Sequence, residues 1–391
     1  MIYLDHHSST PVDPRVVQVM MPYLTDNPGN PSNPYHLLGR RAADAVEEAR
    51  EHVATLIGAT RSEIVFTSGA TESNNLAILG TALAYCGPRK RIITCAVEHK
   101  SVLEPCRRLA DRAFEVIILP VDRMGHVDLL ALERAVDDHT LLVSIQLANN
   151  EIGTIQELEQ IATIVKRRGA WLHCDGAQAV GKIPVDVRNL NIDFLSISAH
   201  KLYGPKGVGA LYIRGGVKRS GLQPLAFGGG QEWALRPGTV NVPGVVGFGE
   251  ACRLCKEEMD AESLRLAALR DRFEQLLLER IPQLQRNGDL SHRLPNNSSL
   301  MFPDVDADAL LLNLPDIALS TGSACTAGAL EPSHVLQAIG LTREQAYRTV
   351  RVGLGRFNTQ EEVETAATRI AEAAFRIRAL GTTASGTTPR A

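Results

Sequence analysis

The sequence lacks the features of a membrane, secreted or nucleic-acid-binding protein. No stretch of its 391 residues approaches about 18 uninterrupted apolar residues, so no transmembrane helix is predicted. The first residues, MIYLDHHSSTP, have neither a basic segment nor an apolar core, and we expect no signal peptide. The formal net charge is only −3 and no long basic run occurs, which argues against nucleic acid or an anionic membrane as the main partner.

Cysteine is scarce as well. Seven cysteines, an odd number in a long chain, are typical of reduced thiols rather than of a disulfide framework. Cys252 and Cys255 form a CxxC pair with no second pair nearby, so we interpret them as two positions on one helix. Hydrophobic residues make up 44% and charged residues 22%, which is enough for a large buried core. We therefore expect a cytoplasmic globular protein of about two domains.

The sequence does contain alternating strand-like and helix-like segments. Apolar runs predict strands at 63–67, 91–95, 115–119, 141–147, 171–175, 194–197 and 208–213. Helical spacing predicts helices at 40–57, 76–85, from about 102, and at 158–168. This alternation through about residue 250 predicts a mostly parallel α/β sheet flanked by helices.

The composition changes after residue 250, where a charged helix is predicted over 251–280 and is followed by shorter strands and helices. We expect a large α/β domain over 15–255 and a smaller α+β domain made of 1–14 and 256–380. The last segment, 381–391, is rich in Thr, Ser, Gly and Pro and is predicted to be disordered.

One lysine follows a predicted strand. The segment DFLSISAHKLYGPKGVGALY places Lys201 between two apolar runs and ahead of a Gly-Pro-Lys-Gly turn. Burial would lower the pKa of its ammonium group and make the amine available as a nucleophile, as a Schiff-base enzyme requires. A lysine that extends its amine to solvent at a strand end is the alternative.

Polar residues also follow three other predicted strands. Asp175 must be paired or hydrogen-bonded at its buried strand end, and a protonated heterocyclic nitrogen is one candidate partner. The turn that begins at Ser68 has the composition of an anion site, although Thr71 and Glu72 could equally be helix caps. His99 lies where open α/β sheets bind ligands, or it caps the next helix.

Three further features concern histidine, cysteine and arginine. His6 and His7 lack partners at metal-ligand spacing, so we interpret them as polar loop residues. Cys325 lies among Gly, Ser, Ala and Thr, a composition typical of a mobile loop, and is the best nucleophile candidate among the cysteines. Arg351 stands within an apolar run and requires a carboxylate, from the protein or from a ligand, in bidentate geometry.

Taken together, these segments resemble the cysteine desulfurases, pyridoxal-phosphate enzymes of the class V aminotransferase family with fold type I. The resemblance extends from Tyr3 to about Phe357 and is carried by FTSGATESNN, VEHKSV, NNEIGT, HCDGAQAVGK, SAHKLYGPKGVGALY, RPGT, GSACTAGALEPSHVL and RVGLGRF. The long cysteine loop, about 320–332, resembles group I of the family, which serves iron–sulfur assembly and tRNA thiolation. The resemblance implies a homodimer with active sites at the subunit interface and a sulfur-acceptor protein as partner.

The resemblance also implies which residues bind the cofactor. Lys201 would bind pyridoxal 5'-phosphate covalently and then move the Cα proton, and His99 would stack on the ring and assist. Asp175 would pair with the pyridine nitrogen, and Gln178 would hydrogen-bond the phenolic oxygen. The remaining cofactor contacts, mainly to the phosphate, would come from Ala70, Thr71, Ser198, His200 and, from the other subunit, Thr239.

The implied reaction converts L-cysteine into L-alanine. Asn150 and Arg351 would bind the substrate carboxylate, and Cys325 would take the sulfur as a persulfide. A selenocysteine lyase or an aminotransferase of the same fold is the alternative enzyme. A non-catalytic sulfur-relay partner is less favoured, because Lys201, Asp175, His99 and Cys325 are all present.

The chain departs from the usual family residues in several places. Serine is usual at Pro237 and at Gly353, and an Asn/Ala/Thr run is usual where His6 and His7 stand. None of these differences removes an implied catalytic group.

Overall fold

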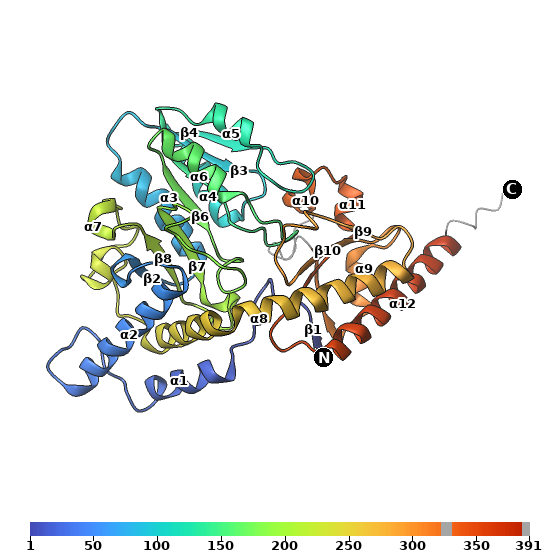
Figure 1. The fold of residues 1–391 in the computed structure, drawn as a ribbon, viewed down its shortest axis with the longest axis horizontal. Coiled ribbons are helices and arrows are strands. Elements are labelled where there is room, and N and C mark those ends of the chain that lie inside the picture. Colours follow the sequence, from blue (N-terminus) through green and yellow to red (C-terminus); the bar gives the residue numbers. More distant parts are fainter. Residues whose placement is uncertain (322–330, 385–391) are drawn as a thin grey trace.

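Seven strands form the central sheet of the computed structural model, which describes residues 1–321 and 331–384 (Figure 1). Their order across the sheet is β2-β8-β7-β6-β5-β3-β4. Along the chain they are β2 (Ile64–Thr67), β3 (Arg91–Cys95), β4 (Glu115–Leu119), β5 (Thr140–Ser144), β6 (Trp171–Asp175), β7 (Phe194–Ser198) and β8 (Gly209–Ile213). Six of these seven strands run in the same direction, and β8 runs opposite to them. This arrangement confirms the predicted mostly parallel sheet.

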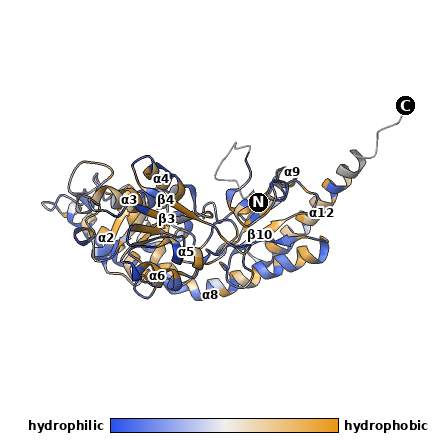
Figure 2. Cartoon of the chain, turned by 90° about the horizontal axis from the view of Figure 1, so that it is seen from above, coloured by the Kyte–Doolittle hydropathy of each residue, from blue (hydrophilic) through white to orange (hydrophobic). Residues whose placement is uncertain are grey.

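Helices cover both faces of this sheet, because successive strand side chains alternate between the faces and both sets are apolar. Ile64 and Phe66 pack with α2 and α8, whereas Val65, between them, packs with α3 and α4 on the other side. The strands are hydrophobic and lie between the helices (Figure 2). The helices of this part are α1 (Pro14–Leu24), α2 (Leu37–Leu56), α3 (Ala70–Ala84), α4 (Lys100–Ala110), α5 (Leu129–Ala135), α6 (Leu158–Arg167) and α7 (Val217–Ser220), with short 3-10 helices η1 (Arg61–Glu63), η2 (Ala199–Lys201) and η3 (Gln231–Ala234).

A second, antiparallel sheet lies beyond the central one, in the order β12-β13-β10-β9 (Figure 1). Its strands are β9 (Gln285–Arg286), β10 (Asn297–Met301), β12 (Ser320–Thr321) and β13 (Thr349–Gly353). A parallel pair joins β1 (Ile2–Tyr3) to β11 (Ile317–Ala318). The helices here are α9 (Ala307–Leu312), α10 (His334–Ala338), α11 (Arg343–Tyr347) and α12 (Gln360–Ala384).

Helix α8 (Val242–Arg280) runs along both parts of the molecule (Figure 1). Its residues up to Cys255 pack in the core under the central sheet, and its residues from Leu266 pack in the core of the second sheet. The division that we predict after residue 255 therefore falls within one continuous helix. Helix α12 extends to Ala384 and overlaps the predicted tail, of which 385–391 lie outside the described residues.

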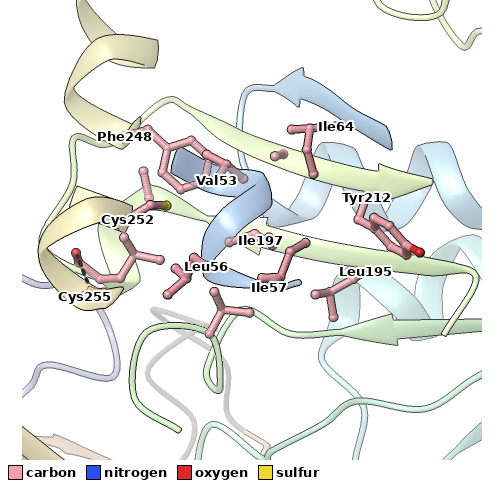
Figure 3. Close-up of a cluster of buried hydrophobic side chains, with 14 of the residues drawn as sticks. Val53, Leu56, Ile57, Ile64, Leu195, Ile197, Tyr212, Phe248, Cys252 and Cys255 are labelled. Carbon is pink, nitrogen blue, oxygen red and sulfur yellow. Dashed lines mark hydrogen bonds between the residues drawn. The ribbon is translucent and has the colours of Figure 1, made fainter. Parts of the chain in front are cut away.

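Cys252 and Cys255 are buried on α8, in the hydrophobic core that this helix shares with α2 and the central sheet (Figure 3). Their interpretation as two positions on one helix is confirmed.

Over residues 1–321 and 331–384, no acidic, histidine or cysteine side chains cluster in threes as metal ligands would. Within the same ranges no helix is both long and apolar enough to cross a membrane.

The N-terminal segment connects the two sheets. Its strand β1 pairs with β11, and Asp5 then forms a bridge with Gly353 of β13. Further along, the Thr10 amide donates to the carbonyl of His200 beyond the end of β7. Residues 5–10 therefore lie between the second sheet and the end of the central sheet.

A buried ion pair joins α2 to the segment before α8, and we expect its loss to destabilise the fold strongly. Arg50 Nη2 and Nη1 lie 2.7 and 2.8 Å from the Glu232 carboxylate oxygens, and both side chains are 4% exposed. Replacing Glu232 by alanine would leave a buried guanidinium without its partner, at a cost of about 3–5 kcal/mol in the free energy of unfolding, measured by urea denaturation.

Glu47 provides the matched control. It contacts the same Arg50 at 3.1 Å but is 48% exposed, so Glu47→Ala should cost about 0–1 kcal/mol. Equal losses in the two variants would contradict the assignment of the stability to the buried pair.

Candidate active site

A cavity of about 420 Å³ lies at the carboxyl ends of the parallel strands, where open α/β sheets bind ligands. Its walls come from the segments that follow β2, β3, β5, β6 and β7, together with the N-terminal segment and β13. The structure brings ten of the twelve predicted site residues to this cavity: Ala70, Thr71, His99, Asn150, Asp175, Gln178, Ser198, His200, Lys201 and Arg351. Thr239 is exposed and does not line it, and Cys325 lies outside the described residues.

Lys201 ends the 3-10 helix η2, directly after β7. Its Nζ donates to the backbone carbonyl of Ser8, at 2.6 Å, and to that of His7. The amine is thus directed into the cavity and does not extend into solvent, which excludes the alternative of a solvent-directed lysine.

Asp175 ends β6 and is 8% exposed. Its Oδ2 accepts a hydrogen bond of 2.7 Å from Asn74 Nδ2, and its Oδ1 accepts one of 3.0 Å from the Ala177 amide. These two hydrogen bonds fix the orientation of the carboxylate at the wall of the cavity. Asn74 was not predicted as a site residue, although its polar side chain stands in the otherwise apolar face of α3.

The turn after β2 leaves the first amides of helix α3 without a side-chain cap. Gly69 is the N-cap residue, with φ 148°, a conformation that favours glycine, and no side chain bonds the first turn. The interpretation of Thr71 as a cap is therefore wrong. Glu72 does bond outside the helix: its carboxylate accepts from the Ser68 amide at 2.6 Å and pairs with Arg236 at 3.1 Å. The helix N-terminus remains directed at the cavity, as an anion site requires.

His99 fulfils both of its predicted alternatives. It is the N-cap of α4, where its Nδ1 accepts from the Ser101 amide at 3.1 Å, and its ring lines the cavity. The Ser101 hydroxyl lies 2.7 Å from the same Nδ1 and accepts from Asn74 at 2.8 Å. Because Nδ1 accepts, the neutral ring carries its proton on Nε2. A chain of hydrogen bonds thereby links His99 to Asp175 through Ser101 and Asn74.

Arg351, on β13, is 2% exposed and is held from three sides. Its Nη2 lies 3.0 Å from Asp5 Oδ1 and 2.7 Å from Ser8 Oγ, and its Nη1 donates to the Asn150 carbonyl at 3.2 Å. Its Nε has no partner among the described residues. The protein carboxylate contacts a single nitrogen of Arg351, so the expected bidentate pairing would have to come from a ligand carboxylate.

His6 and His7 lie in the turn that follows β1, as expected of loop residues, but their side chains are buried there, at 2% and 1% exposed. Burial lowers the pKa of His6 to about 4 and lowers that of His7 well below its ordinary value. The His6 ring packs on Gly355, and a side chain at Gly353 would collide with His7, 2.6 Å away. The two glycines of RVGLGRF were the signal in the sequence, since only small residues leave space for two imidazole rings.

A buried acid lies behind the cavity and provides a prediction for the pH dependence of stability. Glu98 is fully buried, and burial, followed by the charge of Asp175, raises its pKa from 4.5 to about 8. The folded protein therefore holds a proton that the unfolded chain releases between these values. The contribution of Glu98 to the free energy of unfolding is complete below pH 4.5. It is lost as pH rises towards 8, by up to about 1.4 kcal/mol per pH unit.

We expect Glu98→Gln to remove this slope, since the amide keeps the shape of the protonated acid. Urea unfolding from pH 5 to 8 would show the variant gaining stability relative to the parent protein as pH rises. Parallel stability profiles would contradict the assigned proton.

Comparisons with known proteins agree with this site. Residues 2–365 match the model of the class V aminotransferases. The chain is 47% identical over 377 residues to "Cysteine desulfurase IscS" of Anaeromyxobacter dehalogenans, covering 96% of this chain and 93% of that protein. A solved structure named "NIFS-LIKE PROTEIN" superposes with a TM-score of 0.88 at 39% identity, covering 95% of this chain and 98% of that one.

A second solved structure, "SspA in complex with cysteine", is 38% identical, with a TM-score of 0.82, and covers 92% of this chain and all of that one. Because these matches cover nearly the whole chain, they include both sheets and the segments that line the cavity. The chain therefore belongs to the cysteine desulfurases of the class V aminotransferase family.

Proposed function

We propose that this protein is a pyridoxal-phosphate-dependent cysteine desulfurase, which converts L-cysteine into L-alanine and transfers the sulfur to Cys325. One observation carries the proposal: the Lys201 amine, the Asp175 carboxylate, the uncapped start of α3 and the Arg351 guanidinium line a single cavity. The α3 start suits the phosphate of the cofactor, Asp175 suits its ring nitrogen, Lys201 suits its aldehyde carbon, and Arg351 suits the substrate carboxylate.

The residues present fit pyridoxal phosphate. The free amides at the start of α3, with Thr71, Ser198 and His200 beside them, suit a phosphate group. The Asp175 carboxylate, held in place by Asn74 and the Ala177 amide, suits a protonated pyridine nitrogen. When bound, the cofactor withdraws electrons from the substrate Cα and so eases the loss of its proton.

We assign the movement of that proton to Lys201 Nζ, which already lies in the cavity beside the carbonyls of His7 and Ser8. An amine can accept the proton at Cα and return it elsewhere. His99, with its proton on Nε2, would lie against the ring and donate from that atom. Its link to Asp175 through Ser101 and Asn74 keeps the imidazole in one orientation.

We assign the substrate carboxylate to Arg351 and Asn150. Arg351 lines the cavity and is oriented by Asp5 and Ser8, and its Nε has no partner among the described residues. An arginine held on two sides loses little rotamer freedom when a carboxylate binds, which favours tight and well-oriented binding.

Cys325 would carry out the sulfur step. Its thiolate attacks the substrate Sγ, the Cβ–Sγ bond breaks, and the sulfur remains on Cys325 as a persulfide. The electron pair of the broken bond stays with the carbon fragment, which takes up protons and leaves as alanine. Only a thiolate is nucleophilic enough, so the step requires deprotonated Cys325.

The persulfide must then pass to a sulfur-acceptor protein of iron–sulfur assembly or of another thiolation pathway. We further propose a homodimer in which Thr239 completes the partner's cavity, since Thr239 is exposed and lies outside the cavity of its own chain. The six described cysteines are free thiols, which supports a reducing, cytoplasmic location.

The decisive experiment is alanine production from L-cysteine by the cofactor-loaded protein, with a reductant present to release the persulfide. Stoichiometric alanine and sulfide would support desulfuration. Amino-group transfer to a 2-oxo acid without sulfide would identify an aminotransferase, and turnover of selenocysteine alone would identify a lyase. A bound cofactor with no turnover of any substrate would favour the sulfur-relay alternative.

A further inference from the structure

A buried network behind the cavity joins three side chains that the proposed reaction leaves without a role. Lys182 Nζ donates to Gln178 Oε1 at 3.0 Å, and His7 Nδ1 lies 3.0 Å from the same oxygen. Gln178 Nε2 donates to the His7 carbonyl at 3.0 Å, and His7 Nε2 lies 3.2 Å from Asn297 Nδ2. His7, Gln178, Lys182 and Asn297 are each less than 8% exposed.

The chemistry of the partners fixes which atoms donate. A carbonyl can only accept, so the Gln178 atom beside the His7 carbonyl is the nitrogen. The Gln178 atom that faces Lys182 Nζ and His7 Nδ1 is therefore the oxygen. Asn297 Nδ2 donates to the Glu151 carbonyl as well, which places its nitrogen against His7 Nε2. The His7 Nε2 must therefore accept, and its Nδ1 must carry the proton.

The surroundings of His7 keep it neutral in that tautomer. Burial lowers its pKa well below the ordinary value, and the positive charges of Lys182 and Arg351 lower it further. The ring fits because residue 353 is glycine: a Cβ there would lie 2.6 Å from His7 Cδ2. Histidine at position 7 and glycine at position 353, both departures from the family's usual residues, are thus complementary in space.

We propose that His7 and Lys182 are positioning residues that lock the Gln178 amide, so that its nitrogen and not its oxygen is presented to a ligand in the cavity. Both lone-pair directions of Oε1 are occupied by donors, and one N–H of Nε2 is occupied by the His7 carbonyl. The second N–H is the group that remains. It suits an anionic oxygen acceptor, such as the phenolic oxygen of the cofactor. This inference rests on the proposed function only for the identity of that acceptor.

The first test measures cofactor binding, with the visible absorption maximum as a second readout. His7→Ala should weaken pyridoxal phosphate binding about tenfold, equivalent to about 1.4 kcal/mol, and should shift the absorption maximum of the bound cofactor. His7→Asn, which keeps an N–H near the position of Nδ1, should retain the parent affinity and spectrum. Lys182→Met should act in the same direction as His7→Ala.

The role through Gln178 is tested by a double-mutant cycle. In a Gln178→Ala background, His7→Ala should cause no further loss of affinity. Full additivity of the two losses, or an unchanged spectrum in His7→Ala, would overturn the proposal. Neither readout depends on alanine formation, so a protein that binds cofactor normally but does not desulfurate cysteine would refute the proposed function alone.

The second test needs no variant to remain active and no cofactor. With histidine ring nitrogens labelled by ¹⁵N, NMR should show His7 as the neutral Nδ1–H tautomer, identified by the signal that disappears in His7→Asn. An Nε2–H tautomer or an imidazolium would overturn the proposal, whether or not the enzyme desulfurates cysteine.

Discussion

Replacing Lys201 by alanine is expected to abolish covalent cofactor binding and to lower alanine production from L-cysteine by at least about 10²–10⁴-fold, the usual contribution of a positioned proton-transfer group. Lys201 lines the cavity directly after β7, and its Nζ donates to two backbone carbonyls of the N-terminal segment. Loss of the visible absorption band after dialysis or gel filtration measures the first effect, and alanine formation measures the second.

Lys218 is the matched control for this experiment. It is exposed on α7, away from the cavity, so Lys218→Ala should retain both the absorption band and the turnover. Lys201→Arg should fail like Lys201→Ala, because a guanidinium stays protonated and cannot act as the amine. A Lys201→Ala variant that still releases alanine at the parent rate would show that another group moves the proton.

Replacing Cys325 by alanine is expected to abolish sulfur transfer while leaving cofactor binding intact. The loss of turnover should be on the order of 10³-fold or more, the scale on which enzymes lose rate when a covalent nucleophile is removed. Serine at this position should be equally inactive, because its hydroxyl is far less acidic than a thiol and less nucleophilic towards sulfur. Alanine release and labelling of a protein persulfide would be measured together.

Cys86 offers the control among the described cysteines, since it is exposed whereas the other five are buried. Burial raises the pKa of several of these buried thiols, including Cys106 to about 12, which makes them poor nucleophiles. Cys86→Ala should therefore desulfurate cysteine normally. Equal alanine production by the parent protein and by Cys325→Ala would show that Cys325 is not the sulfur acceptor. That result would strengthen the lyase alternative.

Most of the central sheet could be predicted from the sequence because its strands are buried on both faces and read as short apolar runs. Strands β3, β4 and β6 have the predicted bounds. Four helices begin earlier than predicted, and the largest differences are at α3, which begins at Ala70 instead of 76, and at α8, which begins at Val242 instead of 251. The first turn of α3 is polar because it faces the cavity. The first turns of α8 are rich in glycine because they approach α2 closely, with Gly249 against Ala49.

The position of a cavity residue could be predicted where that residue ends a strand, as Asp175 does, or lies shortly after one, as Lys201 does. What could not be predicted are the contacts that depend on distant parts of the chain. His7 meets Gln178 across 171 positions, and Asp5 meets Arg351 across 346. No local pattern encodes such pairs, so the sequence predicts His7 as a loop residue but not its burial against Gln178 and Lys182. Their burial follows only from the path of the N-terminal segment between the two sheets.

That path has a consequence for how the protein is made. Residues 2–8 are synthesised long before their partners in β11 and β13, which follow only at about residue 317 and residue 349. At about 5–20 residues per second, the first segment waits on the order of tens of seconds for the strands that hold it. The cavity wall that it forms, including the carbonyls that receive Lys201, is therefore completed last. We therefore expect the cofactor to bind in its final geometry only after nearly the whole chain has been synthesised.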